Sequence, residues 1–208
     1  MTASGTIAFV DQNKAATEAR RRKATVEAPI QVELLRLWRT SGDRTDRGRW
    51  ADPTGWWRDS GVLGRLGSAL ADLFPDAHPT VVLGTQSRGT MIAALVATHL
   101  GVGVVEVRKN DGPAADSEAW RQRTTPPDYR DRHLRLGFPK GLLLSGERVL
   151  FVDDWVDTGG QAIGVRGLVQ DAGAEWLGAA VIVDDLADAR LRRDLGLRSL
   201  LRGRDVWK

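Results

Sequence analysis

Short apolar runs alternate with amphipathic stretches along most of this sequence, and that alternation restricts the fold more than any other feature. The runs have the length of buried strands, and the stretches between them repeat their apolar residues at helical spacing. The expected strands are 80–83, 102–107, 133–136, 148–152 and 176–183, and the expected helices are 26–38, 61–74, 91–100 and 161–172. Strands that alternate with helices favour an α/β fold, with a central mostly parallel sheet flanked by helices.

Composition and charge exclude several classes of protein. The chain has 208 residues with no Cys, so disulfides, thiolate catalysis and Cys-based zinc sites are excluded, and its three His are too few for a His-rich metal cage. The apolar runs are too short to span a membrane, and the first residues lack the pattern of a secretory signal, so we expect a cytoplasmic protein. The net charge of +3 is a mild excess that does not indicate nucleic acid as a partner.

The chain divides into two parts of different composition. Residues 1–25 are polar and small and end in the basic run 20–23, which is typical of a flexible N-terminal arm with a solvated face. Residues 26–208 carry the apolar pattern and are long enough for a single domain with a real core. Within that domain, the polar stretch 108–132 predicts a long exposed loop, and such loops are usually functional or disordered. The stretch 186–201 predicts an amphipathic, partly helical tail.

The segment VLFVDDWVDTGGQA, residues 149–162, carries the most chemistry. An apolar strand runs into the adjacent carboxylates of Asp153 and Asp154, and the ligands of a parallel sheet bind beyond the carboxyl ends of its strands. The next turn holds two Gly whose backbone N–H groups can converge at the start of a helix, where the helix dipole favours an anion. Because carboxylates repel phosphate but accept hydrogen bonds from hydroxyls, a 5-phosphorylated ribose would satisfy both halves of the segment.

This segment resembles the phosphoribosyl-diphosphate signature of the type I phosphoribosyltransferases, in which an apolar strand leads through two acids to Thr-Gly-Gly. The resemblance implies that Asp153 and Asp154 act in catalysis by orienting the ribose hydroxyls. It also implies that the following turn binds the 5-phosphate. The residues of that turn are Asp157, Thr158, Gly159, Gly160 and Gln161. The family usually has Thr where this chain has Gln161, so one phosphate contact departs from the family pattern.

A second segment, VVLGTQSRGTMIAALVATHLGVGVVEVRK, resembles the strand–loop–helix–strand unit with which the family binds diphosphate. Its Gln-Ser-Arg-Gly loop would hold the diphosphate, and the basic pair at the end of the next strand would add positive charge beside it. The residues implied to contact diphosphate are Gln86, Ser87, Arg88, Gly89, Arg108 and Lys109. The family usually has an acid or a similar residue before Ser-Arg-Gly, and this chain has Thr-Gln there.

The resemblance leaves two carboxylates as candidates for the catalytic group that takes a proton from the base. Asp128 precedes Tyr129 much as a Glu-Tyr pair precedes a strand in the adenine phosphoribosyltransferase branch, which this chain resembles most. Asp157 matches the acid used in the hypoxanthine-guanine branch. Both candidates stay open at this point. The loop that holds Asp128 would close over the diphosphate and exclude water.

The part of the family fold that faces the nucleobase, the hood, is variable, and here it would comprise mainly 26–60 together with 184–208. Adenine-type enzymes stack the base on an aromatic ring near a Phe-Arg-Asp motif. Trp50 fits that position by its distance from the diphosphate loop, and Trp57 fits it by residue type, since Arg-Asp follows. Either ring has the area and the π-face that base stacking requires, although tryptophans also pack in cores.

The implied reaction is phosphoribosyl transfer from 5-phosphoribosyl 1-diphosphate to a nitrogenous base, with adenine favoured, giving a nucleoside 5′-monophosphate and diphosphate. Mg²⁺ would be held by ligand oxygens and water, and Asp153 and Asp154 are the protein groups nearest to it. The family usually forms homodimers, so a homodimer is expected. Two alternatives stay open: a non-catalytic regulatory protein that binds phosphoribosyl diphosphate, and a transferase that acts on a specialised-metabolite acceptor.

Overall fold

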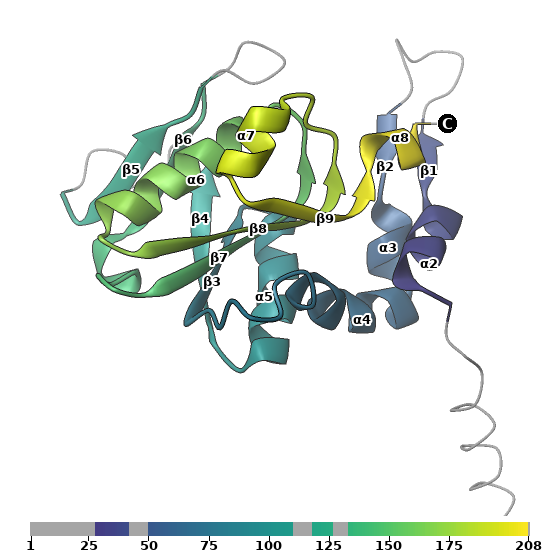
Figure 1. Ribbon diagram of the computed structural model, residues 1–208, viewed down its shortest axis with the longest axis horizontal. Coiled ribbons are helices and arrows are strands. Elements are labelled where there is room, and N and C mark those ends of the chain that lie inside the picture. Colours follow the sequence, from purple (N-terminus) through teal and green to yellow (C-terminus); the bar gives the residue numbers. More distant parts are fainter. Residues whose placement is uncertain (1–27, 42–49, 110–117, 127–132, 208) are drawn as a thin grey trace, which may run out of the picture.

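The computed structural model describes residues 28–41, 50–109, 118–126 and 133–207. Its centre is a seven-stranded sheet in the order β5-β6-β4-β3-β7-β8-β9 (Figure 1). The strands are β3 (Val81–Thr85), β4 (Gly103–Lys109), β5 (Trp120–Thr124), β6 (Arg135–Pro139), β7 (Arg148–Val156), β8 (Glu175–Asp184) and β9 (Leu197–Arg202). The neighbours β4, β3, β7, β8 and β9 run parallel, whereas β6 and β5 form an antiparallel edge. The predicted α/β fold with a mostly parallel central sheet is confirmed.

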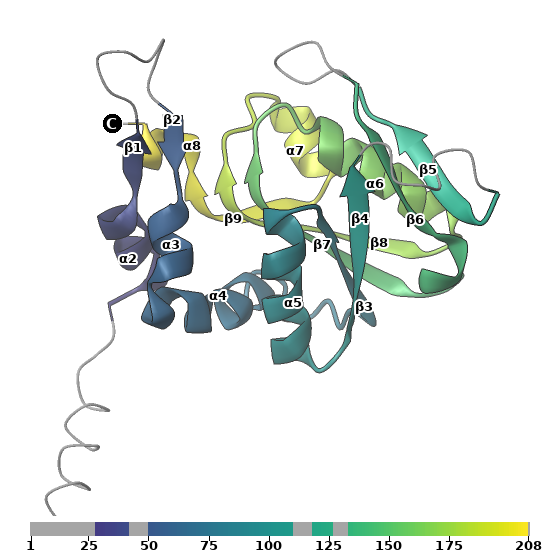
Figure 2. The same cartoon turned by 180° about the vertical axis from the view of Figure 1, so that it is seen from behind.

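Helices cover both faces of this sheet (Figures 1 and 2). They are α2 (Ile30–Leu37), α3 (Thr54–Arg58), α4 (Ser60–Ala71), α5 (Arg88–Leu100), α6 (Gly160–Asp171), α7 (Ala189–Asp194) and α8 (Gly203–Val206), with a short 3₁₀ turn η1 (Lys140–Leu142). A two-stranded sheet of β1 (Arg39–Ser41) and β2 (Trp50–Asp52) lies with α2, α3 and α8 at one side of the molecule in both views. Among the described residues, the helices are too short or too polar to cross a membrane.

Two apolar clusters, one on each face of the sheet, explain the pattern of the central strands. In β7, Leu150 and Val152 belong to the cluster with α4 and α5, whereas Val149 and Phe151 belong to the cluster with α6. Alternate residues of a strand point to opposite faces, and strands of a parallel sheet are buried on both faces. This run therefore has to be continuously apolar up to the point where the strand reaches the site.

The structure corrects three of the predicted elements. β7 was expected to end at 152, but pairing with β8 continues to Val156, so both acids of the signature lie in the strand. The stretch 108–132, predicted to be a loop throughout, contains β5, an edge strand whose partly exposed residues show no apolar alternation. The tail 186–201 contains β9 as well as the short helix α7.

The N-terminal elements also differ in their limits. The helix predicted at 26–38 is observed as α2, which begins directly after Pro29. The helix predicted at 61–74 ends at Ala71. An edge-on contact between the rings of Trp38 and Trp207 joins the two segments predicted to form the hood. The domain boundaries themselves stay a prediction, and the arm at 1–25 lies outside the described residues.

Candidate active site

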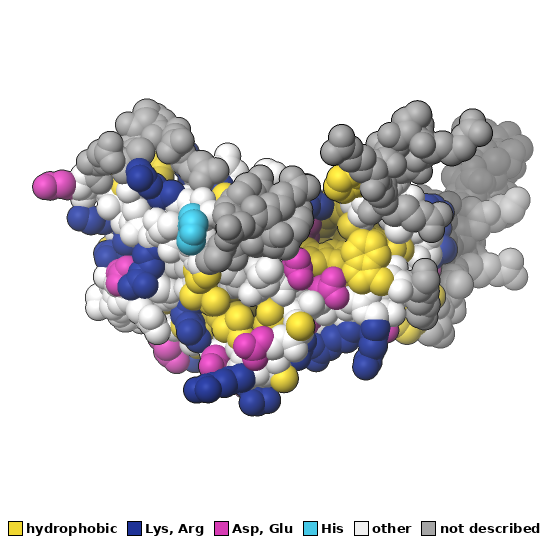
Figure 3. All heavy atoms as spheres, turned by 90° about the horizontal axis from the view of Figure 1, so that it is seen from above, with side chains coloured by type: hydrophobic (Ala, Val, Ile, Leu, Met, Phe, Trp, Pro, Cys, Tyr) yellow, Lys and Arg dark blue, Asp and Glu magenta, His cyan; other side chains and the backbone are white. Residues whose placement is uncertain are grey.

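The carboxyl ends of β3, β7 and β8 open into a cavity of about 590 Å³. Most of the residues predicted for the site line it together. Those residues are Gln86, Ser87, Arg88, Gly89, Lys109, Asp153, Asp154, Asp157, Thr158, Gly159, Gly160 and Gln161. Figure 3 views the molecule from above and shows apolar and acidic side chains next to each other near the middle of this surface. The two signature segments, far apart in sequence, are therefore brought to one place.

Two helices begin at this cavity without a side-chain cap. α6 follows Gly159, whose φ of 77° is in the left-handed region that favours glycine. α5 follows Ser87, whose side chain accepts no capping hydrogen bond, and the first N–H of α6, that of Gly160, makes only a long contact of 3.5 Å with the Thr158 hydroxyl. Neither helix has an acidic residue in its first turn. The first N–H groups of a helix have no partner within the helix, so both ends are suited to bind anions.

The loop before α5 is fixed to the neighbouring strand β4. The backbone N–H of Gln86 donates to the carbonyl oxygen of Val107 at 2.9 Å. The side-chain oxygen of Gln86 accepts a hydrogen bond from the backbone N–H of Lys109 at 3.2 Å. The Gln86–Ser87 peptide bond is cis. These contacts hold the start of α5 beside the end of β4, where Lys109 lines the cavity.

The acid pair at the end of β7 lies between the two helix starts, and its members have different surroundings. Asp153 is buried and accepts hydrogen bonds from the Thr85 hydroxyl at 2.6 Å and from the backbone N–H of Asp154 at 2.9 Å. Burial, reinforced by the charge of Asp154, raises the pKa of Asp153 to about 7. Asp154 instead forms an ion pair of 2.9 Å with Arg88, whose side chain is half exposed.

A further carboxylate, which the sequence analysis did not single out, also lines the cavity. Asp185 directly follows β8, the strand beside β7. Partial burial and the charge of Asp185 raise the pKa of Asp157 above its usual range. Asp184-Asp185 follows an apolar strand just as Asp153-Asp154 does, and that repetition is the signal in the sequence that would have found it.

Two predicted contacts are not brought to the cavity or cannot be located. Arg108 is absent from the described lining, because successive residues of a strand point to opposite faces and Lys109 takes the inward position. The Arg108 guanidinium instead pairs with Glu106 at 3.1 Å and lies 5.5 Å from the centre of the Trp120 ring. Asp128 lies outside the described residues.

The predicted base-stacking residues also lie away from the cavity lining. Trp50 is 50% exposed in β2, outside the lining. Trp57 packs edge-on against the buried Trp56, with ring centres 5.9 Å apart, and lies partly buried against the core cluster. Two other indoles, those of Trp155 and Trp207, line the cavity. The base-stacking role of Trp50 and Trp57 stays a prediction, and neither indole lies in the described lining.

Comparison with known proteins agrees with this geometry. The family model described as phosphoribosyl transferase domain matches residues 63–201. The adenine phosphoribosyltransferase of Nocardia farcinica is 33% identical over 188 residues, which cover 86% of this chain and 91% of that protein.

Solved structures show the same fold. The adenine phosphoribosyltransferase of Thermoanaerobacter pseudethanolicus superposes with a TM-score of 0.72 at 23% identity, covering 83% of this chain and 99% of that one. The adenine phosphoribosyltransferase of Rhodothermus marinus gives a TM-score of 0.67 at 26% identity, covering 83% and 98%. The family match extends over both signature segments and the strands that carry them. This chain therefore belongs to the phosphoribosyltransferase family.

Proposed function

We propose that this protein transfers the 5-phosphoribosyl group of phosphoribosyl diphosphate to a purine base, with adenine as the favoured acceptor. The observation that carries the proposal is one cavity in which two uncapped helix starts flank a pair of carboxylates. A sugar with a phosphate at one end and a diphosphate at the other matches that order of charges. The adenine phosphoribosyltransferases among the relatives support adenine as the base.

Each part of the donor has a matching part of the cavity. The turn Asp157–Gln161 and the start of α6 would bind the 5-phosphate through backbone N–H groups. Asp153 and Asp154 would accept hydrogen bonds from the ribose hydroxyls. The start of α5, with Arg88 and Lys109, would bind the diphosphate by charge-assisted hydrogen bonds.

Catalysis in this arrangement relies on positioning and on charge. A ring nitrogen of the base attacks C1 of the ribose, and the bond from C1 to the diphosphate oxygen breaks with its electron pair leaving on diphosphate. Asp153 and Asp154 would stabilise the positive charge that develops on the ribose, and Arg88 and Lys109 would stabilise the departing diphosphate. The nitrogen then loses its proton to a carboxylate. Asp157 is our candidate for that role among the described residues, since it lines the cavity and partial burial, together with the charge of Asp185, raises its pKa above the usual range.

The residues present fit a magnesium ion that is held mainly by the substrate. Among the described residues there is no cluster of three His, Cys, Asp or Glu that would hold a metal alone. Two adjacent carboxylates in the cavity suit Mg²⁺, which keeps several waters and takes phosphate oxygens. When bound, Mg²⁺ would neutralise charge on the diphosphate. The homodimer and the cytoplasmic location stay predictions from the sequence.

The test is diphosphate release from labelled phosphoribosyl diphosphate and Mg²⁺ in the presence of a panel of bases. We expect release with adenine and formation of AMP in equal amount. Release only with a different base would retain phosphoribosyl transfer and change the acceptor. Binding of phosphoribosyl diphosphate with no release for any base would contradict the proposal and favour a ligand-binding regulatory protein.

A further inference from the structure

Part of the cavity lining has no role in the proposed contacts to phosphate and ribose. Trp155 lies near the end of β7, Asp185 follows β8, and Trp207 follows α8. We refer to these three residues as the indole wall. They come from separate parts of the chain, yet their side chains face the same cavity as the phosphate turns.

Trp207 is held in a defined orientation within the indole wall. Its indole N–H donates a hydrogen bond of 2.9 Å to Oδ2 of Asp185. Its ring lies edge-on to Trp38 and to Trp155, with ring centres 5.7 Å apart in each case. Trp155 in turn stacks on Trp38 at 5.7 Å with an angle of 26° between the planes. The position of Trp207 is thus determined by one hydrogen bond and two ring contacts.

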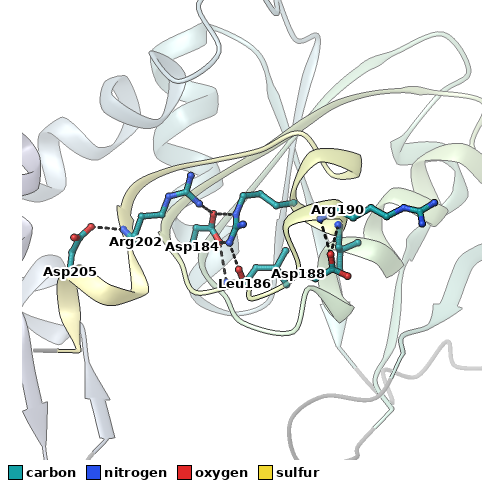
Figure 4. A network of polar contacts seen from close by, with 8 residues as sticks. Asp184, Leu186, Asp188, Arg190, Arg202 and Asp205 are labelled. Atoms are coloured by element: carbon teal, nitrogen blue, oxygen red, sulfur yellow. Dashed lines mark hydrogen bonds and ion pairs between the residues drawn. The ribbon is translucent and has the colours of Figure 1, made fainter.

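Asp185 is itself fixed by the fold. Its backbone N–H donates to the carbonyl oxygen of Val156 at 2.8 Å, and a Cβ at Gly203 would overlap its Oδ1. The preceding residue, Asp184, is buried and accepts hydrogen bonds from Arg192 at 2.7 Å and from Arg202, which points toward it in Figure 4. The end of β8 is therefore anchored, and Asp185 can hold the indole of Trp207 in place.

The exposure of Trp207 leaves its ring accessible to a ligand in the cavity. Its side chain is 47% exposed although it contributes to a concave site. A flat ring stacked on an indole gains roughly 1–3 kcal/mol. Trp50 is equally exposed, at 50%, but lies outside the cavity lining and offers no such position.

The charges near the indole wall select the kind of ring. Asp157 and Asp185 both line this cavity, and they are close enough for the charge of Asp185 to disfavour ionisation of Asp157. Among the described lining residues, the cations are Arg88 and Lys109, and Arg88 is already paired with Asp154. A ring that donates N–H groups would satisfy the Asp157 carboxylate, whereas a ring that carries a carboxylate would be repelled by the negative charges of both acids.

We infer that Trp207, oriented by Asp185, is the platform on which the acceptor ring stacks, and that the acceptor is a neutral flat ring with N–H donors on its edge. The inference rests on the proposed function, because it names the acceptor part of the same site. Trp207 would contact the acceptor directly, and Asp185 would act through Trp207 as a positioning residue.

The first experiment compares the binding of AMP and of ribose 5-phosphate to the full chain by calorimetry. Trp207→Ala should weaken AMP about tenfold or more and leave ribose 5-phosphate within about twofold, because only AMP carries the ring. Trp50→Ala, matched in residue type and exposure, should change neither affinity. An equal loss of both ligands, or no loss of AMP, in Trp207→Ala would overturn the inference. This readout needs no turnover, so a failure of transfer in the diphosphate assay is distinguished from a failure of the platform.

The second experiment tests the role of Asp185 with two variants. Asp185→Asn keeps an oxygen that can accept the indole N–H, and Asp185→Ala removes it. We expect Asp185→Ala to raise the KM for adenine by about three- to tenfold with the KM for phosphoribosyl diphosphate unchanged, and Asp185→Asn to restore it. Equal effects of the two variants, with an unchanged Tm, would contradict a positioning role. Diphosphate release with orotate, a carboxylated ring, at the rate seen with adenine would contradict the charge selection.

Discussion

The part of this cavity proposed to bind phosphate and ribose, called the phosphate end, and the part proposed to bind the acceptor ring, called the acceptor end, are built in different ways. The phosphate end consists of two turns, Gln86–Gly89 and Asp157–Gln161. Each turn is one continuous segment at the junction of a strand and a helix. The indole wall takes its three residues from separate parts of the chain and depends on Trp38 from a fourth. Anion binding needs backbone N–H groups at a helix start, which a few consecutive residues supply. A ring platform needs packed side chains, so it depends on the whole fold.

The two acid pairs that follow buried strands extend this comparison. At the phosphate end, Asp153 is buried with a hydroxyl and a backbone N–H as its partners. At the acceptor end, Asp184 is buried with two guanidinium groups as partners. The Asp153 carboxylate lines the cavity, whereas the Asp184 carboxylate is buried outside the described lining and stabilises the fold there. The same sequence pattern therefore leads to a carboxylate that lines the cavity in one place and to a buried ion-paired carboxylate in the other.

The largest effect is expected from the acid pair Asp153–Asp154 at the phosphate end. The double substitution Asp153→Asn with Asp154→Asn should lower kcat/KM for phosphoribosyl transfer by roughly 10²–10³-fold, since groups that stabilise transition-state charge contribute that much. Circular dichroism should show an unchanged fold. Asp72→Asn, at an exposed position at the end of α4, is the control. Activity of the double variant within about twofold of wild type would contradict the proposal that Asp153 and Asp154 bind the ribose hydroxyls.

The next prediction compares Arg88 and Arg108, which the sequence analysis both predicted to contact diphosphate. Arg88 lines the cavity, whereas Arg108 lies outside the lining and pairs with Glu106. Arg88→Ala should weaken diphosphate by about tenfold or more, with a smaller loss for ribose 5-phosphate, because charge-assisted bonds to phosphate oxygens are lost. Arg108→Ala should change both affinities by less than about twofold. Calorimetry with each ligand checks this, and a larger effect from Arg108→Ala would reverse the assignment.

The phosphate end could be predicted from the sequence because its geometry is local. An apolar run, an acid pair and a Gly-Gly turn before a helix place Asp153 and Gly159 at the same sheet edge with no knowledge of distant contacts. The limit of β7 was missed because polar residues at 153 and 154 lower the apparent strand signal. Pairing with β8 overrides it, since Val156 lies opposite Asp184.

The acceptor end could not be predicted in the same way. Trp207 stands among polar residues with no periodic pattern around it, and its place depends on rings that are distant in sequence. Trp57 fitted the family motif by its neighbours, but it packs partly buried against Trp56 and the core, outside the described cavity lining. The edge strand β5 shows no apolar alternation for a related reason, since partly exposed strand residues need not be apolar.

A stability measurement separates the anchor from the substrate contacts. Asp184→Asn should lower the free energy of unfolding by about 1–3 kcal/mol, because the side chains of Arg192 and Arg202 lose a buried ionic partner. Urea denaturation gives this value, and Asp194→Asn, at an exposed position, is the matched control. Unchanged stability would mean that the end of β8 is held by its strand pairing alone.

The smallest effect is a pH-dependent contribution of Asp153 to the stability of the fold. Burial raises the pKa of Asp153 from 3.8 to about 7. Between these values the unfolded chain releases the proton that the native protein keeps, so this group contributes less stability as the pH rises. Asp153→Asn removes that dependence.

In buffer without ligand or Mg²⁺, the Tm of Asp153→Asn relative to wild type should therefore be a few degrees higher at about pH 8 than at about pH 5. Asp184→Asn should lower the Tm at both values. A pH-independent difference for Asp153→Asn would mean that Asp153 is ionised over the whole range. A higher relative Tm of Asp153→Asn at about pH 8 would mean that the ionised Asp153 carboxylate is a charge that the ligand-free fold disfavours. The ion pairs of Asp184 with Arg192 and Arg202, by contrast, stabilise the end of β8.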